Sequence, residues 1–285
     1  MITVTGATGA LNGATVEHLL LELDPNDLTV VVRDPDRVRP LADRGVVVRR
    51  GDYADPASLH AAFEGSDQLL LVSSNDPGAD TVQLHRHAVE AATSVGVGRV
   101  LYTSHQGAAL ASPFAPARVH AETEQLLKDS GLAWTALRNG FYAHSLAWLM
   151  GPWQETGVVT VPADGPVSWT SRDDAAQAAA AVVLADGGFD GPVTLTGGEA
   201  PTFTQMAVVA SELSGRTITC EVVDPEAWVA AQVAAGRPET VARFTLGIYL
   251  AAAGGFFAGT DPAMGRLLGR DPVSASEVLA QPSQG

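Results

Sequence analysis

The chain begins with a short apolar run, Ile2-Thr3-Val4-Thr5, that leads directly into the glycine-rich turn Gly6-Ala7-Thr8-Gly9 and then into a helical pattern. Gly6 permits a tight turn, and Gly9 lets a diphosphate approach the backbone. The helix that follows directs the positive end of its dipole toward the phosphates. This order predicts the first βαβ unit of a dinucleotide-binding domain.

The third small position of the turn departs from the glycine pattern. In a G-x-x-G-x-x-G motif the third glycine falls on Asn12, and Gly13 stands one residue later. A side chain at Asn12 would crowd the diphosphate or the strand–helix contact, unless the loop is shifted so that Gly13 takes the third role. A tight βα turn that binds no nucleotide is the alternative interpretation.

A cation follows the second apolar run. Residues 28–32 end in Arg33, where an NAD-binding domain carries the Asp or Glu that binds the ribose 2′-hydroxyl. Arginine suits a 2′-phosphate, so the sequence favours NADP over NAD. Arg37 and Arg39 follow and would widen this patch, while ordinary solvated arginines are the alternative.

Composition excludes several function classes. The 285 residues carry a net charge of -15, which repels nucleic acid. The single cysteine, Cys220, excludes an intramolecular disulfide, and we expect no metal site. We find neither an apolar run of eighteen residues nor a signal-type N-terminus, so we expect a cytoplasmic protein without a membrane segment.

Apolar strand-like runs alternate with helical patterns along the first two thirds of the chain. The runs lie at 46–49, 68–72, 99–102, 133–137 and 193–196, and the helical patterns near 57–64, 80–95 and 118–130. This alternation predicts an α/β fold, a doubly wound parallel (Rossmann) sheet with a small C-terminal substrate-binding lobe. We expect residues 1–140 plus 170–198 in the Rossmann domain, and 141–169 plus 199–285 in the lobe.

Several blocks in order resemble the atypical short-chain dehydrogenase/reductases. The similarity points to the branch of type 2 NAD(P)H:quinone oxidoreductases and triphenylmethane reductases, next to the nitrogen-metabolite-repression regulators. The blocks are Thr5–Gly9, Arg33, Gly51–Asp55, Leu69–Ser74, Tyr102–Ser104, His120–Glu124, Leu137–Tyr142 and Leu267–Arg270.

The resemblance implies a set of NADP-binding residues at the carboxyl ends of the strands. Arg33 would meet the 2′-phosphate, and Asp52 and Tyr53 would lie by the adenine. Asp52 and the serines could instead be helix caps. The residues that would line the diphosphate turn are Gly6, Thr8, Gly9, Leu11 and Asn12, and those that would border the ribose and nicotinamide are Ser73, Ser74 and Ser104.

The Tyr-x-x-x-Lys pair of ordinary superfamily members is absent from the expected region. His120 and Glu124 stand there at helical spacing, so they share a face. His120 would protonate a reduced substrate, or the two would form an ordinary exposed pair. We predict His120, Tyr142 and Asn139 as catalytic residues.

Aromatic side chains gather in the segment that we expect to wall the nicotinamide end. The predicted substrate-binding residues are Phe141, His144, Trp148, Trp153 and Trp169. Aromatic walls suit flat, quinonoid rings, while ordinary structural packing is the alternative for each residue taken singly. We therefore expect an NADPH-dependent oxidoreductase of a quinone or polycyclic aromatic, such as an aromatic polyketide tailoring enzyme. The alternatives are an oxygenase-like enzyme that has lost dinucleotide chemistry and a non-catalytic NADP sensor. The protein could also form a homodimer.

Overall fold

The computed structural model describes residues 1–74, 76 and 78–281, which form two compact units. Of the described residues, the first unit comprises those within 1–104, 119–138 and 172–193, and the second comprises those within 105–118, 139–171 and 194–281. The second unit has nearly as many residues as the first, so it is larger than the small lobe that we expected. It also includes residues 105–118, which the sequence placed in the dinucleotide-binding domain.

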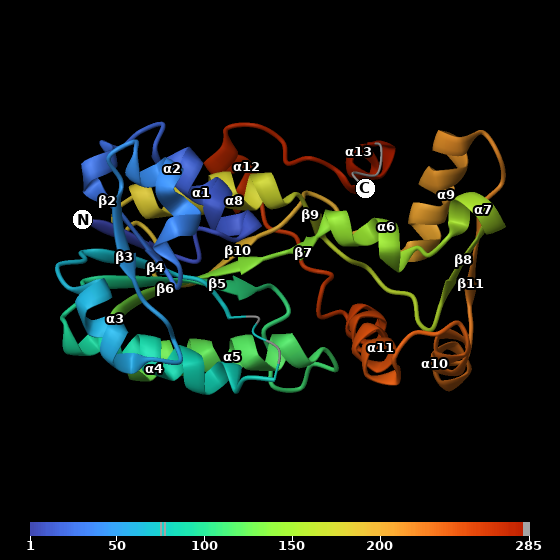
Figure 1. Ribbon diagram of the computed structural model, residues 1–285. Helices are drawn as coiled ribbons and strands as arrows, with labels where there is room; N and C mark the ends of the chain where they lie inside the picture. Colours follow the sequence, from blue (N-terminus) through green and yellow to red (C-terminus); the bar gives the residue numbers. More distant parts are fainter. Residues whose placement is uncertain (75, 77, 282–285) are drawn as a thin grey trace. The chain divides into compact units, whose positions relative to one another are not determined.

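A seven-stranded sheet forms the centre of the α/β fold (Figure 1). The pairings of β1 with β2 and β4, of β2 with β3, and of β4 with β5 are parallel, which confirms the predicted doubly wound sheet. The strands are, in sheet order, β10 (Gly191–Leu195), β6 (Ala133–Asn139), β5 (Arg99–His105), β4 (Gln68–Leu71), β1 (Ile2–Thr5), β2 (Leu28–Val32) and β3 (Val47–Arg50).

Helices cover both faces of this sheet, which explains why β2 and β4 are buried along their whole length. Figure 1 shows α1 (Ala10–Leu19) and α8 (Arg172–Leu184) on one face, and α3 (Pro56–Phe63), α4 (Thr81–Ser94) and α5 (Ala115–Asp129) on the other. Shorter helical segments are η1 (Pro25–Asp27), η2 (Pro35–Val38) and α2 (Arg39–Ala42).

The order in which successive strands are added to the sheet reverses at β1. Strands β2 and β3 lie on one side of it, and β4, β5 and β6 lie on the other. In open parallel sheets, ligands bind at the carboxyl ends of the strands beside such a switch point. The loops that follow β1, β2 and β4 are therefore the place to look for a ligand site.

The second unit is built around a separate aromatic core that includes Trp169, Phe203, Tyr249 and Phe257. Two short parallel pairs contribute to it, β7 (Phe141–Tyr142) with β9 (Trp169–Thr170) and β8 (Val158–Val161) with β11 (Thr219–Val222). Its helices are η3 (Ala143–Ser145), α6 (Leu146–Leu149), α7 (Trp153–Thr156), α9 (Phe203–Ser214), α10 (Pro225–Ala234), α11 (Glu239–Ala253), α12 (Ala263–Leu268) and α13 (Ala275–Ala280). Among the described residues, no helix has the length and apolar character needed to cross a membrane.

Gly165 provides a test of close packing in the second unit. A Cβ at this position would collide with the backbone carbonyl of Ala252, whereas a Cβ at Gly198 would meet no heavy atom within 4 Å. We expect Gly165→Ala to lower the free energy of unfolding by about 1–3 kcal/mol. The control Gly198→Ala should change it by less than about 0.5 kcal/mol. Urea unfolding curves check this, and equal effects of the two substitutions would contradict it.

Candidate functional site

The glycine turn after β1 has the geometry of a phosphate-binding loop. Gly6 has φ +68, and its N–H donates to the Val31 carbonyl at 3.3 Å. A Cβ at Gly6 would lie 2.6 Å from the Val72 side chain, so the tight turn requires glycine here. Helix α1 begins directly after Gly9, without a capping side chain or an acidic residue in its first turn. These features fit a bound diphosphate.

Asn12 does not crowd this turn. Its side chain is 1% exposed, and Nδ2 donates to the carbonyl of Thr5 at 2.8 Å, so it is held inside the strand–turn–helix unit. Gly13 occupies the close contact instead, since a Cβ there would lie 2.9 Å from the Ala7 carbonyl oxygen. The geometry favours the shifted alternative, in which Gly13 has the third glycine's role.

This arrangement predicts opposite effects for two neighbouring substitutions. Gly13→Val should weaken NADPH binding at least tenfold, because the new side chain displaces the backbone of the turn. Asn12→Gly should leave binding within about twofold while lowering the free energy of unfolding by about 1–3 kcal/mol, since the Thr5 carbonyl loses its partner. Fluorescence titration and urea unfolding measure the two effects. Tighter NADPH binding by Asn12→Gly would show that Asn12 crowds the diphosphate after all.

Side chains hold the backbone that follows β4. The N–H groups of residues 72, 73 and 74 donate to Oγ1 of Thr5 at 2.8 Å, Oγ1 of Thr103 at 2.9 Å and Nε2 of His85 at 2.8 Å. Ser73 and Ser74, predicted to border the ribose and nicotinamide, therefore have their amides directed into the protein. The loop is positioned by β1, β5 and α4 together.

The tautomer of His85 follows from its backbone donor. Because Nε2 accepts from the Ser74 amide, the proton of the neutral ring is on Nδ1, which donates to Oγ1 of Thr123 at 2.7 Å. The Thr123 hydroxyl donates in turn to the Val119 carbonyl at 2.9 Å. Burial lowers the pKa of His85 to about 4, so this ring stays neutral near pH 7.

The loop after β3 is held in a similar way. The Tyr53 hydroxyl lies 2.7 Å from Oγ1 of Thr5 and donates to the Val72 carbonyl at 3.1 Å, while Nδ1 of His87 donates to the Tyr53 carbonyl at 2.8 Å. Burial raises the pKa of Tyr53. Asp52 accepts from the Ala54 amide at 3.0 Å, so it forms a local turn and does not cap α3. Their predicted position by the adenine stays a prediction.

The buried His85 predicts a pH dependence of stability. Its pKa falls from an ordinary 6.5 to about 4, so below pH 6.5 the unfolded chain takes up a proton that the folded chain does not. This contribution to stability is complete above pH 6.5 and is lost as the pH falls through about 4. The expected slope is up to about 1.4 kcal/mol per pH unit.

Urea unfolding between pH 7 and pH 4 tests this expectation. The slope should be shallower in His85→Gln than in the wild type, while His60→Gln, on the exposed surface of α3, should keep the wild-type slope. Parallel curves for the wild type and His85→Gln would disprove the assignment.

Arg33 is exposed directly after β2, at the predicted 2′-phosphate position, and it already has a partner. Its Nη1 lies 3.0 Å from each carboxylate oxygen of Asp76, which follows β4. Arg39 pairs separately with Asp36 at 2.8 Å. Sequence reasoning missed Asp76 because no spacing rule links residues 43 positions apart.

His120 and Glu124 each contact residues of other elements. Nδ1 of His120 lies 2.8 Å from the Tyr102 hydroxyl. The Glu124 carboxylate is buried, forms two hydrogen bonds with Arg138 at 2.9 and 2.6 Å, and accepts from the Ser104 hydroxyl at 2.6 Å. Because Glu124 is buried, the pair that we considered from the sequence is not an exposed one. The hydrogen bonds to Glu124 raise the pKa of Arg138.

Burial of the Tyr102 ring raises the pKa of its hydroxyl, which therefore keeps its proton near neutral pH. When His120 is neutral, its Nδ1 either accepts from the Tyr102 hydroxyl, with the ring proton on Nε2, or carries the ring proton and donates to that hydroxyl. When His120 is charged, both nitrogens carry protons. The charged ring therefore has an N–H on Nε2 besides the one shared with Tyr102, and such a donor is what an acid or an oxygen-polarising group requires.

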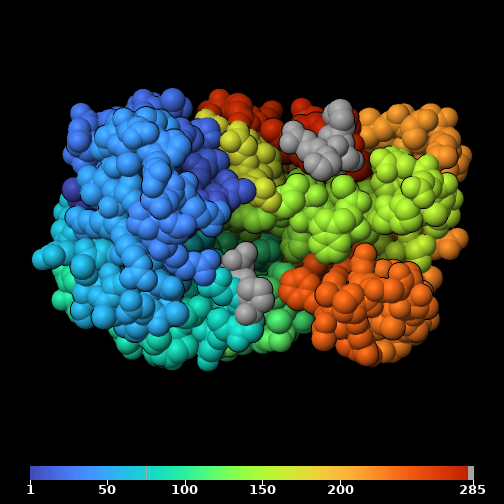
Figure 2. Space-filling model, viewed as in Figure 1, coloured from blue at the N-terminus to red at the C-terminus, as the bar shows by residue number. Residues whose placement is uncertain are grey.

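In the second unit the predicted substrate residues separate by exposure. Phe141, Trp153 and Trp169 belong to the hydrophobic core and are 8%, 5% and 2% exposed. Trp148 is 45% exposed, and Figure 2 shows its segment, near residue 150 in yellow-green, at the surface. His144 is exposed as well. The core positions favour packing, and a substrate role for the exposed residues stays a prediction.

Tyr142 and Asn139, the remaining predicted site residues of this unit, lie close to each other. The rings of Tyr142 and His144 stack with centroids 5.7 Å apart, and Nδ2 of Asn139 lies 3.5 Å from the Tyr142 hydroxyl, a long hydrogen bond. Asn139 is itself buried. Sequence reasoning also missed His105, whose ring packs against Phe114, Phe141 and Phe257 and whose pKa burial lowers to about 4.

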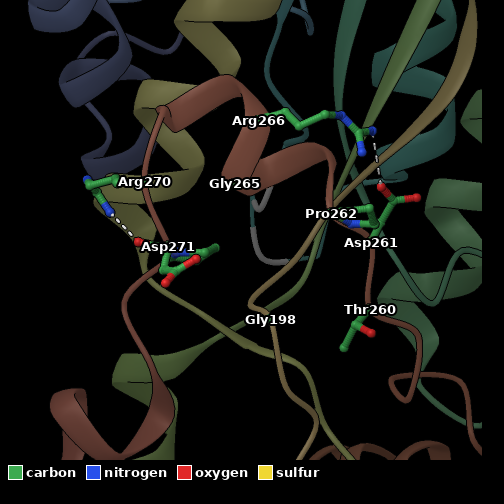
Figure 3. A pocket seen from close by; sticks show the side chains of 9 residues that line it. Gly198, Thr260, Asp261, Pro262, Gly265, Arg266, Arg270 and Asp271 are labelled. Atoms are coloured by element: carbon green, nitrogen blue, oxygen red, sulfur yellow. Dashed lines mark hydrogen bonds and ion pairs between the residues drawn. The ribbon is translucent and has the colours of Figure 1, made fainter.

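A cavity of about 770 Å³ lies elsewhere in the second unit, and its nine lining residues do not include a predicted site residue (Figure 3). Arg266 is directed toward Asp261 at 3.9 Å, and Nη1 of Arg270 donates to the Asp271 carbonyl at 3.1 Å. The described residues contain no cluster of three or more His, Cys, Asp or Glu side chains suited to a metal ion.

The fold and the turn after β1 together define a dinucleotide-binding Rossmann protein. A family model described as NAD(P)H-binding matches residues 6–186, so the chain belongs to this family. Quinone oxidoreductase 2 of Escherichia coli is 34% identical over 98% of both chains. An NAD(P)H azoreductase of Xenophilus azovorans is 30% identical, covering 97% of this chain and 96% of its own.

Solved structures agree with this assignment. The E. coli quinone oxidoreductase QOR2, complexed with NADPH, matches with a TM-score of 0.90 and 32% identity over 98% of this chain and 99% of its own. The Citrobacter sp. triphenylmethane reductase, complexed with NADP(H), matches with a TM-score of 0.87 and 32% identity over 99% and 100% of the two chains. The resemblance to this branch of the atypical short-chain dehydrogenase/reductases is confirmed.

Proposed function

We propose that the protein is an NADPH-dependent reductase of quinones and related flat aromatic acceptors. The observation that carries the proposal is the exposed Arg33 directly after β2, beside a glycine turn whose Gly6 tolerates no Cβ. Relatives named as quinone, azo-compound and triphenylmethane reductases support the same chemistry.

The chain's own residues suit the cofactor. The turn from Gly6 to Gly9 and the N-terminus of α1 would hold the diphosphate, and Arg33 would bind the 2′-phosphate by charge-assisted hydrogen bonds. The nicotinamide, when bound, supplies a hydride to the acceptor. The protein then has two tasks, to orient the acceptor and to deliver one proton to the reduced oxygen, which completes the hydroquinone.

His120 is the proposed proton donor. The Tyr102 hydroxyl, 2.8 Å from Nδ1, orients the ring, and the charged ring carries a proton on Nε2 that it can deliver. In the second unit, Asn139 and Tyr142 are proposed as polar contacts of the acceptor, and the exposed Trp148 and His144 as contacts of its ring. Within this class, we propose naphthoquinone-like and anthraquinone-like aromatic polyketides as natural acceptors.

Binding and turnover with purified protein test the proposal. NADPH should bind more tightly than NADH, and Arg33→Glu should weaken NADPH binding by about ten- to a hundredfold while leaving NADH nearly unchanged. NADPH oxidation should depend on added 1,4-naphthoquinone. His120→Gln should lower kcat by about a hundredfold without loss of NADPH binding, and the exposed His60→Gln serves as its control.

The results also separate the alternatives. NADPH binding without oxidation by naphthoquinones, azo dyes or triphenylmethane dyes would support a sensor. Acceptor conversion by a protein that binds neither dinucleotide would show that the fold has been kept for a different reaction. Equal affinities for NADPH and NADH, unchanged by Arg33→Glu, would remove Arg33 from the cofactor site.

A further inference from the structure

The Arg33–Asp76 ion pair connects two loops at the carboxyl edge of the sheet. Arg33 follows β2 and Asp76 follows β4, and β1 lies between these strands. Both carboxylate oxygens of Asp76 lie 3.0 Å from Nη1 of Arg33. The side chains are 63% and 38% exposed, so the pair is open to solvent and can be exchanged for another ligand.

The Arg33–Asp76 pair changes the charge that the 2′ position of an incoming nucleotide would face. The Arg33 guanidinium, which would bind a 2′-phosphate, is already paired with the Asp76 carboxylate. The negative charge of Asp76 therefore offsets the positive charge that a 2′-phosphate needs. A phosphate must displace Asp76 from Arg33 and is repelled by it. A ribose 2′-hydroxyl would instead find a carboxylate that can accept a hydrogen bond from it, the interaction by which NAD-binding domains select NAD.

We propose that Asp76 is a specificity-determining residue that opposes Arg33, lowering affinity for 2′-phosphorylated nucleotides and narrowing the preference for NADPH over NADH. This inference rests on the proposed function, since it takes Arg33 as the 2′-phosphate ligand. The carboxylate that usually stands at the end of the second strand is supplied here by the neighbouring loop. The consequence is a cofactor site that uses both dinucleotides with less discrimination than Arg33 alone would give.

The test measures binding of two fragments that lack the nicotinamide, 2′,5′-ADP and 5′-ADP, by calorimetry at low salt. Asp76→Asn should bind 2′,5′-ADP about two- to fivefold more tightly than the wild type, the range expected for release from an exposed ion pair. Affinity for 5′-ADP should stay equal or fall. The gain should shrink at 0.5 M salt because exposed charges are screened.

Two further variants make the test specific. Glu17→Gln breaks another exposed arginine–carboxylate pair, that of Arg44 with Glu17 at 2.8 Å, which contains no predicted cofactor residue, and should change neither affinity. In an Arg33→Met background, Asp76→Asn should tighten 2′,5′-ADP binding less than it does in the wild type, because the coupling between the two side chains is absent and only the repulsion between carboxylate and phosphate is relieved.

Weaker binding of both fragments by Asp76→Asn would overturn the inference, since Asp76 would then be closing the loop over the nucleotide. An equal gain with and without Arg33 would overturn it as well. If the wild type binds 2′,5′-ADP well and Asp76→Asn is unchanged, this inference alone fails. If the wild type binds neither fragment, the proposed function fails with it.

Discussion

The cofactor edge of this protein depends on how the backbone amides of residues 72–74 are satisfied. A strand that has ended leaves its next N–H groups without ladder partners, and buried donors are costly when unpaired. Here Thr5, Thr103 and His85 accept all three. Three separate elements therefore fix the loop beside the switch point, and they do so with protein groups alone. The loop is pre-organised for a ligand.

The need of buried backbone groups for hydrogen-bond partners also explains the departure from the glycine motif. Asn12 is tolerated because its amide turns inward to the Thr5 carbonyl, at the end of the strand that supplies the turn. The close contact that the motif assigns to a third glycine moves one residue along, to Gly13. A motif read by position alone would count Asn12 as a defect, whereas the loop satisfies the physical requirement with a shifted residue.

Burial separates two arginine–carboxylate pairs that are chemically alike. The Arg138–Glu124 pair joins β6 to α5 with a buried carboxylate, and removing one partner would leave an uncompensated charge, so it organises the fold. The Arg33–Asp76 pair is exposed and contributes little to stability, so a ligand can replace it. The same sheet therefore carries one ion pair that stabilises the fold, Arg138–Glu124, and one that a ligand can replace, Arg33–Asp76.

The sequence by itself determined the alternation of strands and helices, the glycine turn and the cation after β2, because these depend on periodicity and on neighbours within a few residues. The sequence also identified the family, because several of its short motifs occur in the order typical of that family. Only the tertiary structure decided the partners: Asp76 for Arg33, Tyr102 for His120, and Arg138 with Ser104 for Glu124. Each of these contacts joins residues from different strands, loops or helices, and a parallel sheet brings them together through crossovers that leave no local pattern in the chain.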